Sequence, residues 1–219
     1  MSRRFVLVVL VLVVAAGLPA AAQAELPEHA RGVGPAAARG PVLAEETPID
    51  RLHLFFPQDP DTTWFLDTFG HVRADGHRHI GVDMHAPKGS PVYAVAAGVV
   101  TRMDISPRAG AYLVINHGGG WESWYMHLNT DNPGTDDRRG GYATAFAAAV
   151  VVGGFVDAGQ AVGFVGDSGN AEHTLPHTHF ELHRNGKAVD PFSMLVNAHE
   201  RARMAVHAER LSLLTDRIA

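Results

Sequence analysis

The sequence predicts a mainly β fold, an antiparallel sheet or sandwich domain that is followed by a C-terminal α-helix. Short stretches that alternate apolar and polar residues recur between residues 51 and 191, and glycine-rich turns separate them. Alternation with a period of two is typical of strands that bury one face. From residue 192 to 218, apolar residues instead recur at intervals of three or four, which indicates a helix.

The strands and loops follow in order along the chain. We expect strands at residues 79–83, 91–100 with a bend near Gly98, 111–117, 121–128, 161–165 and 176–183, and an edge strand at 150–156. Three glycines at 118–120 join two of these strands as the central hairpin. A long loop follows over residues 129–150, with a short helix at 143–149, and a loop of this length in a compact domain is usually functional or disordered.

Composition limits the classes of function. The chain has 219 residues, of which 46% are hydrophobic and 19% charged, as suits one globular domain with extensions. A net charge of −5 gives no basic footprint for nucleic acid, so no nucleic-acid partner is expected. The absence of cysteine excludes disulfides, thiolate zinc sites and cysteine nucleophiles. A metal would therefore be held by the 14 histidines or by carboxylates.

The first residues read as a targeting segment. Arg3 and Arg4 precede an apolar run from Phe5 to Leu18, and Ala22-Gln23-Ala24 matches a signal-peptidase site. We expect a signal peptide at 1–24, cleaved after Ala24; an uncleaved anchor is the alternative, although the run is short for a membrane span. The mature protein would be exported to the extracellular space or the cell envelope, without a permanent membrane anchor. The rest of the chain is expected to comprise a flexible segment at 25–50, a β-rich globular domain at 51–191 and a helix at 192–219.

Two histidines on one predicted strand indicate a metal site. His177 and His179 stand two residues apart, so on a strand they share one face with Glu181. Phe180 and Leu182 would then face the opposite, apolar side. A strand that buries one face does not normally place paired imidazoles on the other, so we interpret this strand as one wall of a metal site.

A second pair of potential ligands lies upstream. On a strand, His79 and Asp83 share a face with Gly81, whose missing side chain leaves room between them. With one of the paired histidines they would supply three ligands and leave the fourth position to water, as in catalytic zinc sites. Spacing alone does not choose between the paired histidines. His85 is the main rival ligand, and the turn at Ala86-Pro87 argues against it.

The chain resembles a known family through motifs that occur in the same order from Phe69 to Pro191. These motifs are H-x-G-x-D at 79–83, A-P-K-G-S-P-V-Y-A at 86–94, W-Y-M-H-L at 124–128, A-G-Q at 158–160, G-F-V-G at 163–166, H-T-H-F-E at 177–181 and V-D-P at 189–191. They closely resemble the lysostaphin-type (LytM-like) zinc metallopeptidases. The resemblance implies a groove over an antiparallel sheet with one zinc ion at its floor, and cleavage of peptide bonds in the cross-links or stems of bacterial peptidoglycan.

The resemblance also assigns residues. It implies that His79, Asp83 and His179 bind the Zn²⁺ ion and that His127 and His177 are catalytic. The expected function is a secreted zinc metalloendopeptidase that hydrolyses peptidoglycan peptide bonds with zinc-activated water. The alternative is a zinc-binding regulator that activates other cell-wall hydrolases without catalysis; the filled ligand and catalytic positions favour the enzyme.

Two features depart from the family pattern. Thr178 stands where the family usually has leucine, and it faces the core side of the predicted strand. The loop at 129–150 is longer than in compact members of the family. It therefore bears on the width of the groove and on the choice of substrate.

Overall fold

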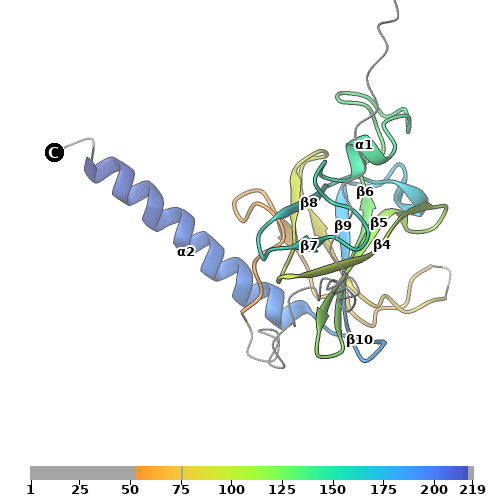
Figure 1. Ribbon diagram of the computed structural model, residues 1–219, viewed down its shortest axis with the longest axis horizontal. Coiled ribbons are helices and arrows are strands. Elements are labelled where there is room, and N and C mark those ends of the chain that lie inside the picture. The colour runs from red at the N-terminus through yellow and green to blue at the C-terminus, as the bar shows by residue number, and fades with distance from the viewer. Residues whose placement is uncertain (1–52, 75, 217–219) are drawn as a thin grey trace, which may run out of the picture. The chain divides into compact units, whose positions relative to one another are not determined.

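The described part of the chain, residues 53–74 and 76–216 of a computed structural model, is built on an eight-stranded antiparallel sheet (Figure 1). In spatial order the sheet contains β1 (Trp64–Phe65), β2 (Val82–His85), β9 (His177–Arg184), β6 (Trp121–Leu128), β5 (Gly110–Gly118), β4 (Gly98–Ser106) and β7 (Phe155–Val156), and β10 (Lys187–Val189) pairs with β9. A second, two-stranded sheet pairs β3 (Pro91–Tyr93) with β8 (Ala161–Phe164). The helices are α1 (Tyr142–Ala145), the 3₁₀ turn η2 (Gly169–Ala171) and α2 (Phe192–Asp216).

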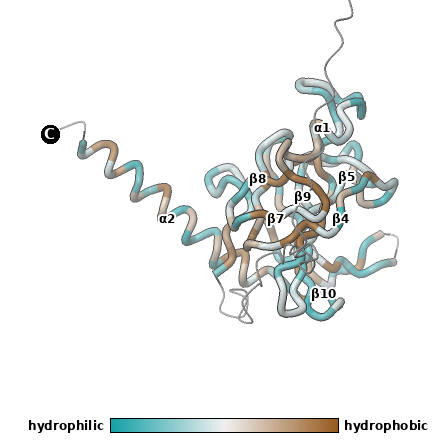
Figure 2. The backbone as a smooth tube through the Cα atoms, viewed as in Figure 1, coloured by the Kyte–Doolittle hydropathy of each residue, from teal (hydrophilic) through white to brown (hydrophobic). Residues whose placement is uncertain are grey.

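One face of the large sheet forms the hydrophobic core. On β9, Phe180 and Leu182 are fully buried, and they share the core cluster with Val92 of β3, Val162 of β8 and Leu195 of α2. The apolar colour in Figure 2 accordingly gathers among the strands, whereas the surface loops are mostly hydrophilic. The alternate residues of β9, which include the paired histidines, are therefore left on the face away from this core.

The C-terminal helix packs on the domain through its first turns. Within α2, Leu195 and Ala198 are buried, and the Nε2 atom of His199 lies 2.8 Å from the carbonyl oxygen of Pro60. Further along, Met204 is 71% exposed and Leu214 is 54% exposed. In residues 53–74 and 76–216, no helix combines the length and apolar character that a membrane span requires.

The predicted fold class is confirmed, including the central hairpin of β5 and β6, the long loop after it and the C-terminal helix. Helix α1 at Tyr142–Ala145 is shorter than predicted, and of the edge strand predicted at 150–156 only β7 forms. The predicted signal peptide at 1–24 and the segment at 25–50 lie outside the described residues.

The prediction of a single strand at 91–100 is wrong, because the chain passes from one sheet to the other within this range. Strand β3 ends at Tyr93 and β4 begins at Gly98. Between them, the amide of Val95 donates to the hydroxyl of the buried Tyr125 over 2.9 Å instead of to a strand. Gly98 is required at the entry to β4, since a Cβ there would lie 2.7 Å from Cγ2 of Ile115. The predicted bend near Gly98 is thus a transfer between two sheets.

The strand predicted at 79–83 begins later than expected. Strand β2 starts at Val82, whereas the backbone of His79 pairs with an earlier segment: its amide donates to the carbonyl of His71 over 2.8 Å, and its carbonyl accepts from Gly70 over 2.7 Å. A local hairpin rather than strand alternation therefore positions the His79 side chain.

Candidate metal centre

Three predicted ligands meet on the face of the sheet away from the core. Asp83 on β2 and His179 on β9 are directly opposed, which places both side chains on one face, and the hairpin before β2 brings His79 beside them. The Nε2 atom of His79 lies 2.9 Å from Nδ1 of His179 and 3.1 Å from Oδ1 of Asp83. The third side of this triangle, from Nδ1 of His179 to Oδ1 of Asp83, is 2.9 Å.

These donor atoms fit a zinc ion. Nitrogen and oxygen ligands of tetrahedral zinc at about 2.0–2.1 Å are separated from one another by about 3.3 Å, close to the observed spacing. The outer nitrogen of each ring is already committed, since Nδ1 of His79 lies 3.1 Å from the carbonyl of Thr68 and Nε2 of His179 lies 3.0 Å from Oε1 of Glu181. If these outer nitrogens carry the protons, two imidazole lone pairs and a carboxylate oxygen converge on one point, an arrangement that a cation stabilises.

The carboxylates around His179 set the protonation of this site. Burial alone would lower the pKa of the His179 imidazole, but its hydrogen bonds with Asp83 and Glu181 outweigh burial and raise that pKa to about 9. Burial likewise opposes ionisation of Asp83, but hydrogen bonds with His179 and His79 hold the pKa of its carboxyl well below the usual range. Asp83 is therefore ionised, and a metal ion that binds His179 displaces a proton from it at neutral pH.

Glycine at position 81 leaves space for the ring of His179. A Cβ at Gly81 would lie 2.8 Å from Nε2 of His179 and would also collide with the carbonyl oxygen of Phe180. The sequence indicated open space between His79 and Asp83, and the structure fills that space with the imidazole from β9.

Gly81→Ala is therefore expected to push the His179 ring away from Glu181. We expect a zinc affinity about 10–100-fold lower, because loss of an outer partner of a ligand costs that much, and a free energy of unfolding lower by about 1–3 kcal/mol from overpacking. Zinc titration and denaturant unfolding measure the two effects. The neighbouring Ile80→Ala, at an exposed position, is the control, and equal zinc affinity in both variants would contradict the steric explanation.

His127 reaches the same face through an irregularity in β6. Two residues of β6, Met126 and His127, oppose the single residue Tyr112 of β5, and His127 adopts a left-handed φ of 59°. Regular alternation would have turned its ring to the core side with Tyr125, so the bulge redirects it. A positive φ in a residue other than glycine is strained and is typical of functional positions.

The His127 ring is held as a neutral imidazole. Its Nδ1 lies 2.9 Å from the carbonyl oxygen of Ser168 and donates to it, which directs the lone pair to Nε2. Burial, together with the nearby imidazoles of His177 and His179, lowers the pKa of His127 to about 4. At neutral pH this ring can accept a proton.

His177 lies beside the triangle of donor atoms but outside it. Its Nδ1 donates to the carbonyl of Leu175 over 2.8 Å, and its Nε2 lies 4.0 Å from Oδ1 of Asp83, compared with 2.9 Å for Nδ1 of His179. The ring centroids of His127 and His177 are 5.2 Å apart. Two imidazoles thus flank the three donor atoms.

The rival ligand His85 requires a correction. Strand β2 continues through His85, which lies opposite His177 on the same face, so the Ala86-Pro87 turn does not end the strand before it. The ring nevertheless stacks on Trp64 with centroids 4.1 Å apart, and its centroid lies 5.2 Å from that of the His177 ring. Among the described residues, the group around Asp83 that can hold a metal contains His79 and His179 but not His85.

Sequence reasoning missed one contact of the ligand carboxylate. Arg73, on the hairpin before β2, forms an ion pair with Oδ2 of Asp83, so Oδ1 alone faces the two imidazoles. No spacing rule connects an arginine on an exposed hairpin with this carboxylate. The second oxygen of a predicted ligand carboxylate still needs a partner, and that requirement is the one signal that the sequence contains.

The fold and the site together define a class of protein. A β-sheet domain with two imidazoles and a carboxylate around one point, flanked by two further imidazoles, is suited to metal-dependent hydrolysis. The profile of peptidase family M23 matches residues 77–191, more than half of the chain, and the chain belongs to this family. The predicted resemblance to lysostaphin-type peptidases is thereby confirmed.

Relatives with assigned names are similar over the same region. DD-carboxypeptidase/endopeptidase Mpg of Neisseria meningitidis is 35% identical over 122 residues, which cover 56% of this chain and 24% of that protein. Peptidoglycan DD-endopeptidase ShyA of Vibrio cholerae is 34% identical over 112 residues, which cover 51% of this chain and 22% of that protein. The chain thus spans less than a quarter of the length of either relative.

A solved structure supports the fold. Lysostaphin from Staphylococcus simulans aligns with a TM-score of 0.51 at 27% identity, and the alignment covers 67% of this chain and 55% of that one.

Proposed function

We propose that the chain is a zinc-dependent endopeptidase that hydrolyses peptide bonds of bacterial peptidoglycan. The observation that carries the proposal is the convergence of three donor atoms within 3.1 Å, from His79, Asp83 and His179, beside two imidazoles whose Nδ1 atoms are committed to backbone carbonyls. Membership of peptidase family M23 supports the reaction, and the name of ShyA, a peptidoglycan DD-endopeptidase, supports the substrate class.

In this proposal His79, Asp83 and His179 hold one zinc ion. Zinc supplies Lewis acidity, which polarises a carbonyl group and makes water more acidic. Glu181 and the Thr68 carbonyl orient the two ligand rings, and Arg73 holds the other oxygen of Asp83.

The two remaining histidines would act on protons and charge. His127, neutral and with its lone pair on Nε2, is suited to accept a proton, and the Nε2 atom of His177 faces the same region. Once such a ring has accepted a proton on Nε2, it can also donate a hydrogen bond from that atom to the oxyanion that develops when a peptide carbonyl is attacked. The proposal includes export through a cleaved segment at 1–24, since peptidoglycan lies outside the cytoplasm. It places the catalytic domain at 51–191 and a helix at 192–219.

Removal of the metal is expected to abolish the activity. Purified full chain incubated with purified peptidoglycan should release new amino groups, because peptide hydrolysis frees one amine for each bond cut. A chelator should reduce this release to background, and added zinc should restore it where added magnesium does not. Amine labelling of the whole digest, soluble and insoluble, measures the release.

The same assay separates the two candidate functions. A protein that binds zinc yet releases no amines alone, but increases release by a second wall hydrolase, would be a regulator. Release by the isolated chain that depends on zinc supports the endopeptidase.

A further inference from the structure

One short segment contacts both histidines that flank the metal centre. The carbonyl of Gly166 accepts the backbone amide of His177 over 2.9 Å, and the carbonyl of Ser168 accepts Nδ1 of His127 over 2.9 Å. The segment therefore fixes where β9 begins at His177 and which way the ring of His127 points. Asp167 lies between these two carbonyls in the chain.

Asp167 forms an ion pair with a lysine that is distant in the sequence. Its side chain is 7% exposed, and its Oδ1 lies 2.8 Å from Nζ of Lys88, in the turn between β2 and β3. The next residue of that turn, Gly89, donates its amide to the carbonyl of Val165 over 2.7 Å. The turn that contains Lys88 thus contacts this stretch of chain twice. The amide of Gly89 binds the carbonyl of Val165, and the ammonium group of Lys88 binds the carboxylate of Asp167.

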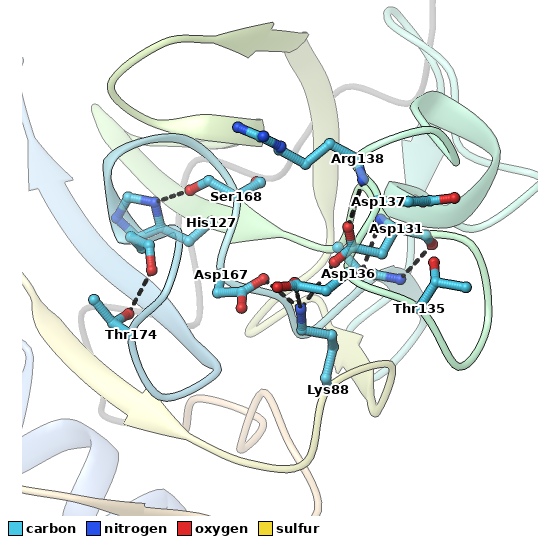
Figure 3. A network of polar contacts seen from close by, with 12 residues as sticks. Lys88, His127, Asp131, Thr135, Asp136, Asp137, Arg138, Asp167, Ser168 and Thr174 are labelled. Atoms are coloured by element: carbon cyan, nitrogen blue, oxygen red, sulfur yellow. Dashed lines mark hydrogen bonds and ion pairs between the residues drawn. The ribbon is translucent and has the colours of Figure 1, made fainter.

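The same ammonium group binds the long loop after β6. Its Nζ atom lies 2.9 Å from Oδ2 of Asp131, which is buried, and 2.7 Å from Oδ1 of Asp136, which is exposed. Figure 3 shows the lysine nitrogen among the three carboxylates, with Ser168 reaching the ring of His127 beside them. Three carboxylates around one point can suggest a cation site, but here the lysine supplies the cation.

Lysine suits this position because an ammonium group has three N–H donors and here meets three carboxylate acceptors. The planar guanidinium of arginine, which directs its donors in one plane, does not match acceptors on three sides. The chain has only two lysines, Lys88 and Lys187, the second being an exposed residue of β10. Lys88 is thus the centre of a cluster that joins the β2–β3 turn, the long loop and the segment carrying Asp167.

We propose that Lys88 is a positioning residue, which through Asp167 holds the Gly166–Ser168 segment so that its carbonyls orient His127 and His177. The proposal rests on the proposed function, in which these two histidines act on the substrate. Without the ammonium group, the buried carboxylate of Asp167 would lose its counter-charge and turn toward water. The two flanking carbonyls would then shift, whereas His79, Asp83 and His179 have no contact with the segment among the hydrogen bonds described for them.

The test compares variants of the zinc-loaded full chain. Lys88→Met is expected to lower kcat for amine release from peptidoglycan about tenfold or more, since small displacements of catalytic groups have effects of this size, and to leave zinc content and KM within about twofold. Lys187→Met removes the other lysine and should leave kcat unchanged.

A matched pair of carboxylate variants distinguishes positioning of the segment from loss of charge or loosening of the loop. Asp167→Ala and Asp136→Ala each remove one carboxylate that contacts Nζ of Lys88, but only Asp167 belongs to the Gly166–Ser168 segment. Asp167→Ala should reproduce the loss of kcat, and Asp136→Ala should not. Equal losses in these two variants, or a kcat for Lys88→Met within twofold of the unaltered chain, would overturn the proposal.

A readout independent of activity separates this proposal from the proposed function. In ¹⁵N–¹H spectra, Lys88→Met and Asp167→Ala should shift the signals of the His127 ring and the His177 amide, and Lys187→Met should not. If the unaltered chain releases no amines, the proposed function fails while these spectra still decide whether Lys88 positions the two histidines. Unchanged His127 and His177 signals in Lys88→Met would refute the positioning role.

Discussion

Replacing His179 with alanine is expected to remove zinc binding and peptidoglycan hydrolysis together. Its Nδ1 atom closes the triangle of donor atoms, at 2.9 Å from both His79 Nε2 and Asp83 Oδ1. Loss of an outer partner of a metal ligand already costs about 10–100-fold in affinity, so loss of the ligand itself should exceed about 100-fold. Competition with a chromophoric zinc chelator measures the affinity, and amine release measures hydrolysis.

The matched control lies on the same strand and face. His183 contacts Glu181 over 2.6 Å, and Glu181 in turn holds His179. His183→Ala should therefore change zinc affinity by no more than about tenfold and should keep the enzyme active. Full hydrolytic activity in His179→Ala would rule out the proposed metal centre, whatever the behaviour of the control.

The sequence was most informative where one strand decides the geometry. The alternation on β9 correctly separates Phe180 and Leu182, which are fully buried in the core, from His177 and His179 on the other face. A period of two is a local property of the backbone, so it can be read without knowing which strand is the neighbour. The same alternation places Glu181 on the face of the paired histidines, and its Oε1 atom lies 3.0 Å from Nε2 of His179.

Positions that depend on backbone irregularity were not predictable in this way. Alternation along β6 places His127 on the core side, and only the bulge opposite Tyr112, with the left-handed φ at His127, turns the ring to the metal centre. Here the family motif indicated the function of a residue whose geometry the strand pattern contradicts. Conversely, the pattern at 79–83 indicated the correct neighbours for the wrong reason, since a hairpin and not a strand positions His79.

Contacts between segments that are far apart in the chain could not be predicted from the sequence. Lys88 and Asp167 lie in turns that the sequence predicts, but nothing in either turn indicates that the other lies next to it. Their proximity follows from the pairing of β3 with β8, which the sequence did not separate from the main sheet. Such contacts depend on which strands pair, and this pairing brings together the residues that we propose orient the site.

Replacing His177 with alanine is expected to leave zinc bound and to abolish turnover. The Nε2 atom of His177 lies 4.0 Å from Asp83 Oδ1, outside the triangle of donors, so zinc affinity should stay within about tenfold of the unaltered chain. Loss of a group that transfers a proton in the transition state costs about 10²–10⁴-fold in rate. We therefore expect kcat for amine release to fall by that factor, with zinc content measured on the same sample.

The contrast between His177 and His179, two residues apart on β9, is the sharper result. His173→Ala, at an exposed position in the turn before β9, serves as the control and should retain both zinc and kcat. If His177→Ala and His179→Ala lose zinc equally, the two histidines are both ligands and the division proposed between them is wrong. If His177→Ala retains zinc and loses turnover while His179→Ala loses both, two imidazoles on one face of β9 have separate tasks. The 2.9 Å and 4.0 Å distances to a single carboxylate oxygen would then be what separates a ligand from a catalytic group.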